Sequence, residues 1–201
     1  MTSQGRFPIA CAGNARVGKD TLFVCLKTIL KEYNIEVEQF SLANILKSDL
    51  NKFLIEKTGI SSYTIDEKEK EIIRPLFVEY GQIQRSLSQG KYWSSLLTTP
   101  IKNSLESGLL PIITDVRYHV YPEDEYFWLK NVLGGELVYI KRTLENGKEI
   151  PPPNKMEAEN NPKLDKLADY HLNWPTTSDE NVRLDYTRVQ LAPLINKIIN
   201  A

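Results

Sequence analysis

The chain has 201 residues, a net charge of −1 and 41% hydrophobic residues, which suffices for one domain with a sizeable core or one domain carrying a lid. The near-neutral charge argues against a large nucleic-acid footprint, and no apolar run approaches the ~20 residues needed to span a bilayer. Because the N-terminus has no charged-then-apolar signal pattern, we expect a cytoplasmic protein that does not act on membranes.

The first feature in chain order is a short apolar run over residues 7–12, followed by a glycine loop and a helical pattern. The loop reads Gly13, Asn14, Ala15, Arg16, Val17, Gly18, Lys19, Asp20 and Thr21. A strand, a glycine loop, a lysine and a helix in this order are typical of a phosphate-binding loop. The glycines let backbone N–H groups point inward, and the helix N-terminus adds partial positive charge. Lys19 would then reach the β- and γ-phosphates of a nucleotide.

One position departs from the general loop pattern. Asp20 stands where serine or threonine normally supplies a hydroxyl to Mg²⁺, and a hydroxyl comes one residue later, at Thr21. Either side chain, or both, could place the ion, because Mg²⁺ prefers oxygen ligands. The alternative interpretation of the whole stretch is a glycine-rich turn without a chemical role.

After the loop, strands and helices are predicted to alternate. Apolar spacing predicts helices over residues 18–33, 42–57, 66–80, 92–107, 123–133 and 182–199, and further strands over residues 35–42, 109–114, 136–141 and 169–174. Pro75 and Pro100 could kink or break two of these helices. The alternation favours a parallel sheet of five strands with helices on both faces.

Two charged residues follow the apolar run 109–114 directly. In an open α/β sheet the carboxyl ends of the strands carry the ligand chemistry, so Asp115 could position Mg²⁺ or an acceptor. Arg117 could hold the phosphate of an acceptor through its planar donor fork. The alternatives are a turn-capping role for Asp115 and a surface ion pair for Arg117.

Residues 142–166 form a polar, proline-containing segment with little apolar periodicity. A polar excursion between two predicted strands is typical of a lid over a site. The alternative is a disordered surface loop.

Taken in order, these motifs make the chain resemble the phage-type deoxynucleoside monophosphate kinases, within the P-loop nucleoside-monophosphate kinase group. The loop ending at Gly18-Lys19-Asp20-Thr21 matches the variant of that family, including its aspartate. Asp115-Val116-Arg117 resembles the Asp-x-Arg at a strand end in the family. Individually weaker similarities cover residues 41–47, 74–81, 92–93, 134–142 and 169–173.

The resemblance implies a P-loop NTPase fold, a three-layer α/β sandwich with a five-stranded parallel sheet, as one domain over residues 1–201. It implies a helical acceptor region at about 42–107 and a lid at about 142–168. The implied activity is ATP- and Mg²⁺-dependent phosphoryl transfer to a deoxynucleoside 5′-monophosphate, giving the diphosphate. Residues 13–21 would bind ATP.

The resemblance also distributes roles among further residues. The implied catalytic residues are Lys19, Asp115, Arg117 and Arg142; the implied acceptor contacts are Lys47, Arg74, Gly81, Arg85, Trp93 and Arg117; the implied metal ligands are Asp20, Thr21 and Asp115. Several of these have other interpretations, since Trp93 could pack in the core, Arg85 could be solvated and Arg142 could be a surface arginine. The lid lacks the dense arginine cluster that many such kinases use.

Two other functions fit the same residues. One is a P-loop kinase that phosphorylates a hydroxymethylated base in phage DNA, although the near-neutral charge disfavours a long DNA track. The other is a regulatory nucleotide-binding protein without turnover, against which Asp115, Arg117 and the lid-like segment argue. The expected partner is a small-molecule nucleotide, with modified DNA as the alternative acceptor. A homodimer is a further possibility, as is a location in the host cytoplasm for a phage-encoded chain.

Overall fold

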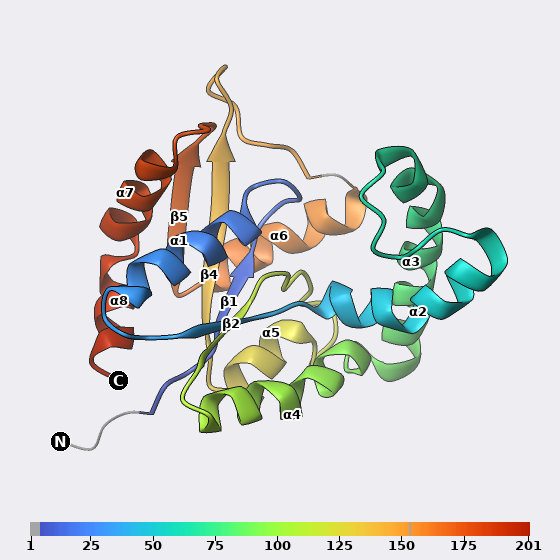
Figure 1. Ribbon diagram of the computed structural model, residues 1–201, viewed down its shortest axis with the longest axis horizontal. Helices are drawn as coiled ribbons and strands as arrows, with labels where there is room; N and C mark the ends of the chain where they lie inside the picture. The colour runs from blue at the N-terminus through green and yellow to red at the C-terminus, as the bar shows by residue number, and fades with distance from the viewer. Residues whose placement is uncertain (1–4, 153) are drawn as a thin grey trace.

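The computed structural model describes residues 5–152 and 154–201, and its middle layer is a sheet of five parallel strands (Figure 1). The strands lie in the order β2-β3-β1-β4-β5. Their bounds are β1 (Ile9–Ala12), β2 (Val37–Phe40), β3 (Leu110–Ile113), β4 (Glu136–Thr143) and β5 (Tyr170–Pro175). β1 and β3 are continuous apolar runs because both faces of these central strands are covered by helices. The five predicted strands are therefore confirmed, with bounds that differ by one to two residues at most ends.

Helices cover both faces of this sheet (Figure 1). One face carries α1 (Lys19–Lys31), α7 (Glu180–Gln190) and α8 (Ala192–Ile199); the other carries α4 (Tyr92–Glu106), α5 (Glu125–Phe127), the π-helical turn η1 (Trp128–Val132) and α6 (Lys155–Leu167). Alternate residues of β1 serve the two cores. Ile9 and Cys11 pack into the core under α1, whereas Ala10 and Ala12 face the core under α4 and η1. The predicted three-layer arrangement is thus confirmed.

α2 (Leu42–Thr58) and α3 (Glu67–Ser88) leave the carboxyl end of β2 and project to one side of the sheet, where α4 joins them (Figure 1). Pro75 and Pro100 lie inside α3 and α4 without ending them. Both prolines are exposed, so water can satisfy the carbonyl groups that lose a helical donor. Within the described residues, no helix is both long and apolar enough to cross a membrane.

The polar segment 142–166 is more regular than its sequence suggests. β4 continues to Thr143, and the Ile150 N–H returns to the Arg142 carbonyl at 3.1 Å after a turn. α6 then begins with its first turn capped by the Asn154 side chain, and Leu164 is buried in the core. The helical signal was weak because α6 buries polar residues along with apolar ones. Pro153 lies outside the described residues, and closure of this segment as a lid stays a prediction.

Two other predicted helices differ in detail. Residues 123–133 form the short α5 followed by the π-helical turn η1. The predicted helix 182–199 is two helices, which separate at Leu191, just before a proline in the first turn of α8. Proline lacks an N–H group, so it starts a new helix more readily than it continues an existing one.

Candidate functional site

At two positions, the loop between β1 and α1 has a backbone conformation with positive φ that favours glycine. Gly13 has a φ of +132° and Gly18 a φ of +100°. A Cβ atom at residue 13 would clash with the carbonyl oxygen of Ile140, and one at residue 18 would lie 2.7 Å from the Trp174 ring. Each glycine therefore lets the loop pass directly against a neighbouring strand.

The same loop presents backbone donors. No side chain of residues 5–152 or 154–201 caps the N-terminus of α1, which begins at Lys19. Among the described residues, the N–H groups of Ala15, Arg16 and Gly18 have no hydrogen-bond acceptor. A curled loop of free N–H groups in front of a helix N-terminus attracts anions, phosphate above all.

Lys19 closes this loop from the inside. Its Nζ donates to the carbonyl oxygens of Gly13 at 2.8 Å and Asn14 at 2.9 Å. Burial lowers the pKa of Lys19 to about 8, and the neighbouring Arg117 guanidinium lowers it too, against the opposing effect of nearby carboxylates. A bound anion would favour the charged amine, so the geometry suits a phosphate that takes the place of the two carbonyl groups.

A cleft of about 210 Å³ opens beside Lys19 at the carboxyl ends of the strands. Its lining consists of Lys19, Asp20, Gln39, Ser41, Ala43, Asn44, Lys47, Thr114, Asp115 and Arg117. Three cationic side chains reach it from different elements: Lys19 from α1, Lys47 from α2 and Arg117 from the segment after β3. The structure thus brings together five of the predicted site residues, and the cleft suits an anionic ligand.

Asp20 and Thr21 face different spaces. Asp20 lines the cleft, and its Oδ1 accepts a hydrogen bond from Gln39 Nε2 at 3.0 Å. Thr21 instead lines a smaller pocket of about 30 Å³ on the other side of α1. Consecutive residues of a helix point about 100° apart, so the two candidate metal ligands cannot serve the same position. Among the described residues, no group of three His, Cys, Asp or Glu side chains is arranged around a common point.

Asp115 caps α2. Its Oδ1 accepts from the Leu42 N–H, and its Oδ2 accepts from the Ala43 N–H and the Ser41 hydroxyl, all at 2.8 Å. Three donors thus occupy most of the lone pairs of the carboxylate. The side chain thus fixes the start of α2, and with it the wall of the cleft that carries Lys47, while the metal-ligand and catalytic roles of Asp115 stay predictions.

Arg117 is held by carboxylates at both its backbone and its side chain. The Arg117 N–H donates to Glu125 Oε2 at 2.7 Å, and its Nη1 pairs with Glu157 Oε1 at 3.1 Å. Burial raises the pKa of Glu125 to about 7, although the Arg85 guanidinium acts in the opposite direction. Sequence reasoning missed both glutamates, since each lies in a polar stretch without a motif. The only signal for Glu157 was its spacing from the buried Leu164, two helical turns away.

Four predicted acceptor contacts lie outside the cleft lining, and three of these are buried. Arg85 is 3% exposed and pairs with Asp124 and Glu125, each at 2.8 Å. Trp93 is 4% exposed and packs edge-on against two tyrosine rings. Gly81 lets α2 and α3 approach, since a Cβ there would lie 3.0 Å from a Leu46 methyl group. The structure thus gives these three residues packing and ion-pair roles, and Arg74 lies exposed on α3. Contact of these four residues with an acceptor stays a prediction.

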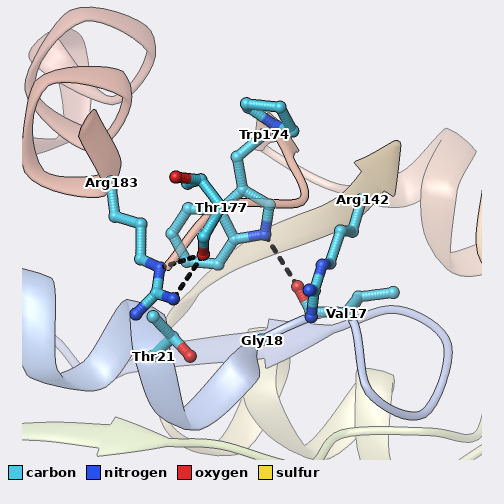
Figure 2. Close-up of a pocket in the computed structure, with 8 residues that line it drawn as sticks. Val17, Gly18, Thr21, Arg142, Trp174, Thr177 and Arg183 are labelled. Carbon is cyan, nitrogen blue, oxygen red and sulfur yellow. Dashed lines mark hydrogen bonds between the residues drawn. The ribbon is translucent and has the colours of Figure 1, made fainter. Parts of the chain in front are cut away.

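The smaller pocket joins the loop to β5 (Figure 2). Trp174 Nε1 donates to the Val17 carbonyl at 2.7 Å, and Arg142 Nη1 donates to the Arg16 carbonyl at 3.3 Å. Figure 2 shows Thr21 and Arg183 on the far side of the Trp174 ring from Arg142. Arg142, a predicted catalytic residue, therefore lies at the outer edge of the loop and does not line the cleft.

Comparison with solved structures finds distant similarities. Dephospho-CoA kinase from Campylobacter jejuni is 12% identical, with 94% of this chain and 98% of that chain covered and a TM-score of 0.44. A protein from Chloroflexus aurantiacus described as a "putative kinase" is 13% identical, with 94% and 100% covered and a TM-score of 0.39. No protein-family model matches the sequence, and no curated protein matches it. The functional assignment therefore rests on the loop sequence and on the geometry of the site.

Proposed function

We propose that this chain is a kinase that transfers the γ-phosphoryl group of ATP to the phosphate of a deoxynucleoside 5′-monophosphate. One observation carries the proposal: Lys19 of the glycine loop shares a single cleft with Lys47 and Arg117. Phosphoryl transfer requires mainly positioning and positive charge around the migrating group. A donor phosphate in the loop and an acceptor phosphate near Arg117 would both be neutralised within this space.

On the donor side, the loop supplies backbone N–H groups and the Lys19 amine. Gly13 and Gly18 supply the positive-φ backbone that curls the loop, so that its N–H groups can face a phosphate. Thr21 offers a hydroxyl on the side of α1 that faces the smaller pocket. That position suits a contact with the part of ATP remote from the transferred group.

On the acceptor side, the Arg117 fork and the Lys47 amine would hold the monophosphate. An oxygen of this monophosphate forms the new bond to the γ-phosphorus, and the bond from that phosphorus to the β–γ bridging oxygen breaks, releasing ADP. The attacking oxygen is already ionised at neutral pH, so the reaction needs no general base. This agrees with the engagement of Asp115 in capping α2.

Mg²⁺ fits the residues of the cleft. Asp20 faces the cleft with a carboxylate whose Oδ1 has one described donor, Gln39, and whose Oδ2 has none among the described residues. Mg²⁺ commonly uses one or two carboxylates together with phosphate oxygens and water. When bound, the ion would neutralise charge on the phosphates of ATP. Asp20 would hold it directly or through water.

The choice of a deoxynucleoside monophosphate rests on the loop sequence Gly18-Lys19-Asp20-Thr21, which resembles that of phage-type deoxynucleotide kinases. The test is a phosphoryl-transfer assay with Mg-ATP and each of the four deoxynucleoside monophosphates, and separately with unmodified and hydroxymethylated duplex DNA. We expect a deoxynucleoside diphosphate from at least one monophosphate. Label transfer only to modified DNA, or ATP binding without transfer to any acceptor, would overturn the proposal.

A matched pair of variants links the activity to the loop. Lys19→Met should abolish turnover while leaving the fold intact, as circular dichroism would check, because the amine contacts the loop carbonyls of Gly13 and Asn14 and not the hydrophobic core. Lys52→Met is the control, since that side chain is 87% exposed on α2 and its only ion pair among the described residues, to Glu56, is 3.9 Å long. Near-normal activity in Lys19→Met would show that the loop is not the donor site.

A further inference from the structure

Helix α6 reaches both halves of the site from one face. Glu157 and Asn161 are four residues apart, so they lie one above the other on the helix. Glu157 is 3% exposed and Asn161 4% exposed. Glu157 pairs with Arg117 at 3.1 Å, and the Asn161 amide donates to Asn14 Oδ1 in the glycine loop. No sequence motif pointed to either residue.

The contact with Arg117 leaves most of its donors available. Glu157 engages Nη1 only, whereas a guanidinium carries five N–H donors in a fixed plane. The Arg117 side chain is 38% exposed and lines the cleft. Glu157 therefore fixes one corner of the fork while the remaining N–H groups can face an anion.

The contact with the loop is equally specific. The Asn14 side chain accepts from Asn161 and donates from Nδ2 to the Ile150 carbonyl at 2.6 Å. Its amide is thus held at both ends. The backbone carbonyl of Asn14 also accepts a hydrogen bond from Lys19. The position of Asn14 therefore helps to set the position of the Lys19 amine, which would face the donor phosphates.

α6 is itself well anchored. Leu164 is fully buried in the core that lies against β1 and β4, and the Asn154 side chain accepts from the Glu157 N–H at 2.9 Å at the helix start. Because α6 is packed firmly against the sheet, the side chains on its surface are held in defined positions.

We propose that Glu157 and Asn161 are positioning residues on α6. Glu157 holds Arg117, which would bind the acceptor phosphate, and Asn161 holds the glycine loop, which would bind the donor phosphates, so that the two keep a fixed relative position. This inference rests on the proposed kinase function.

The experiment compares steady-state KM values for acceptor and for ATP in Glu157→Ala, Glu157→Gln and Asn161→Ala. Loss of a charge-assisted hydrogen bond should raise the acceptor KM of Glu157→Ala about tenfold and leave the ATP KM within about twofold. Glu157→Gln retains an acceptor oxygen and should recover part of this loss. Asn161→Ala should raise the KM for ATP, not for the acceptor. Glu159→Gln is the matched control, because Glu159 is exposed on the same helix and, within the part of the chain that the structure describes, pairs only with Lys155, at 3.7 Å.

Double-mutant cycles separate positioning from a general structural role. Adding Glu157→Ala to Arg117→Ala should not raise the acceptor KM further, and adding Asn161→Ala to Asn14→Ala should not raise the ATP KM further. Additive losses, or equal changes in both KM values for each single variant, would overturn the inference.

Failure of the proposed function would be recognised separately. If the wild-type protein phosphorylates no deoxynucleotide, that function falls, and the inference is tested by binding alone. ATP titrated by calorimetry should then bind more weakly to Asn161→Ala, and inorganic phosphate more weakly to Glu157→Ala, than to the wild type. Unchanged affinities in both variants would overturn the inference.

Discussion

Raising the pH should weaken ATP binding through a single group, Lys19. Its pKa is lowered to about 8 by burial and by the nearby Arg117 guanidinium. Only the charged amine attracts phosphate, so affinity should be lost as the pH rises through this value. Between pH 7.5 and 9, a group with a pKa of about 8 loses most of its charge, and the dissociation constant should rise about eightfold.

Calorimetry offers two readouts of this effect. The dissociation constant of a non-hydrolysable ATP analogue is measured across the pH range, and the binding enthalpy at pH 8 is compared in buffers of different ionisation enthalpy. At pH 8 about half of the free molecules carry a neutral Lys19, so binding should take up about half a proton. The Lys19→Met variant should bind weakly, with no pH dependence in this range.

Unfolding cannot produce the same trend. The pKa of Lys19 is about 8 in the folded chain, against an ordinary value of 10.5. The unfolded chain therefore holds this proton more tightly, and the contribution of Lys19 to stability rises with pH between these two values. As the pH rises above about 8, ATP binding should therefore weaken while the contribution of Lys19 to the free energy of unfolding increases. An affinity that stays constant from pH 7.5 to 9, or one that falls equally in Lys19→Met, would refute the reasoning.

Further predictions concern the packing around the site. Gly18→Ala should cost more stability in urea unfolding than Gly147→Ala, by about 1 kcal/mol or more, because both have a positive φ but only residue 18 would meet a side chain, the Trp174 ring at 2.7 Å. Arg85→Met should destabilise the fold by about 3–5 kcal/mol, because two buried carboxylates lose their partner. The same change at the exposed Arg74 should stay within about 0.5 kcal/mol. Trp174→Phe should cost about 1 kcal/mol by removing the 2.7 Å hydrogen bond to the loop carbonyl, and intrinsic tryptophan fluorescence during unfolding would follow the loss.

The frame of the fold was predictable because its signals are local. Continuous apolar runs identify β1 and β3, and the glycine loop fixes where the first helix begins. The order of the strands in the sheet was not predictable, since it depends on which strands pair across long loops. The sequence pattern did not predict α6, because its buried face carries Glu157 and Asn161 at positions where an amphipathic helix usually has apolar side chains.

The proposed donor half of the site has a clearer sequence signal than the proposed acceptor half. The loop residues are contiguous in the sequence and carry a spacing that reflects backbone geometry. The candidate acceptor residues come from separate elements, so a motif could not distinguish Lys47, which lines the cleft, from Arg85, which is buried in an ion pair. Asp115 can cap α2 because β3 ends beside the start of that helix. The two segments are far apart in the sequence, so no local pattern could predict this contact.

The central claim is that donor and acceptor phosphates occupy one cleft at the same time. The most direct measurement is the affinity of a molecule that joins adenosine to a deoxynucleoside through five phosphates, compared with ATP and the deoxynucleoside monophosphate alone. If the Lys19 loop and Arg117 face one space, the joined molecule should bind about 100-fold more tightly than ATP, because its second half binds at a high effective concentration. An affinity no greater than that of ATP would contradict the account.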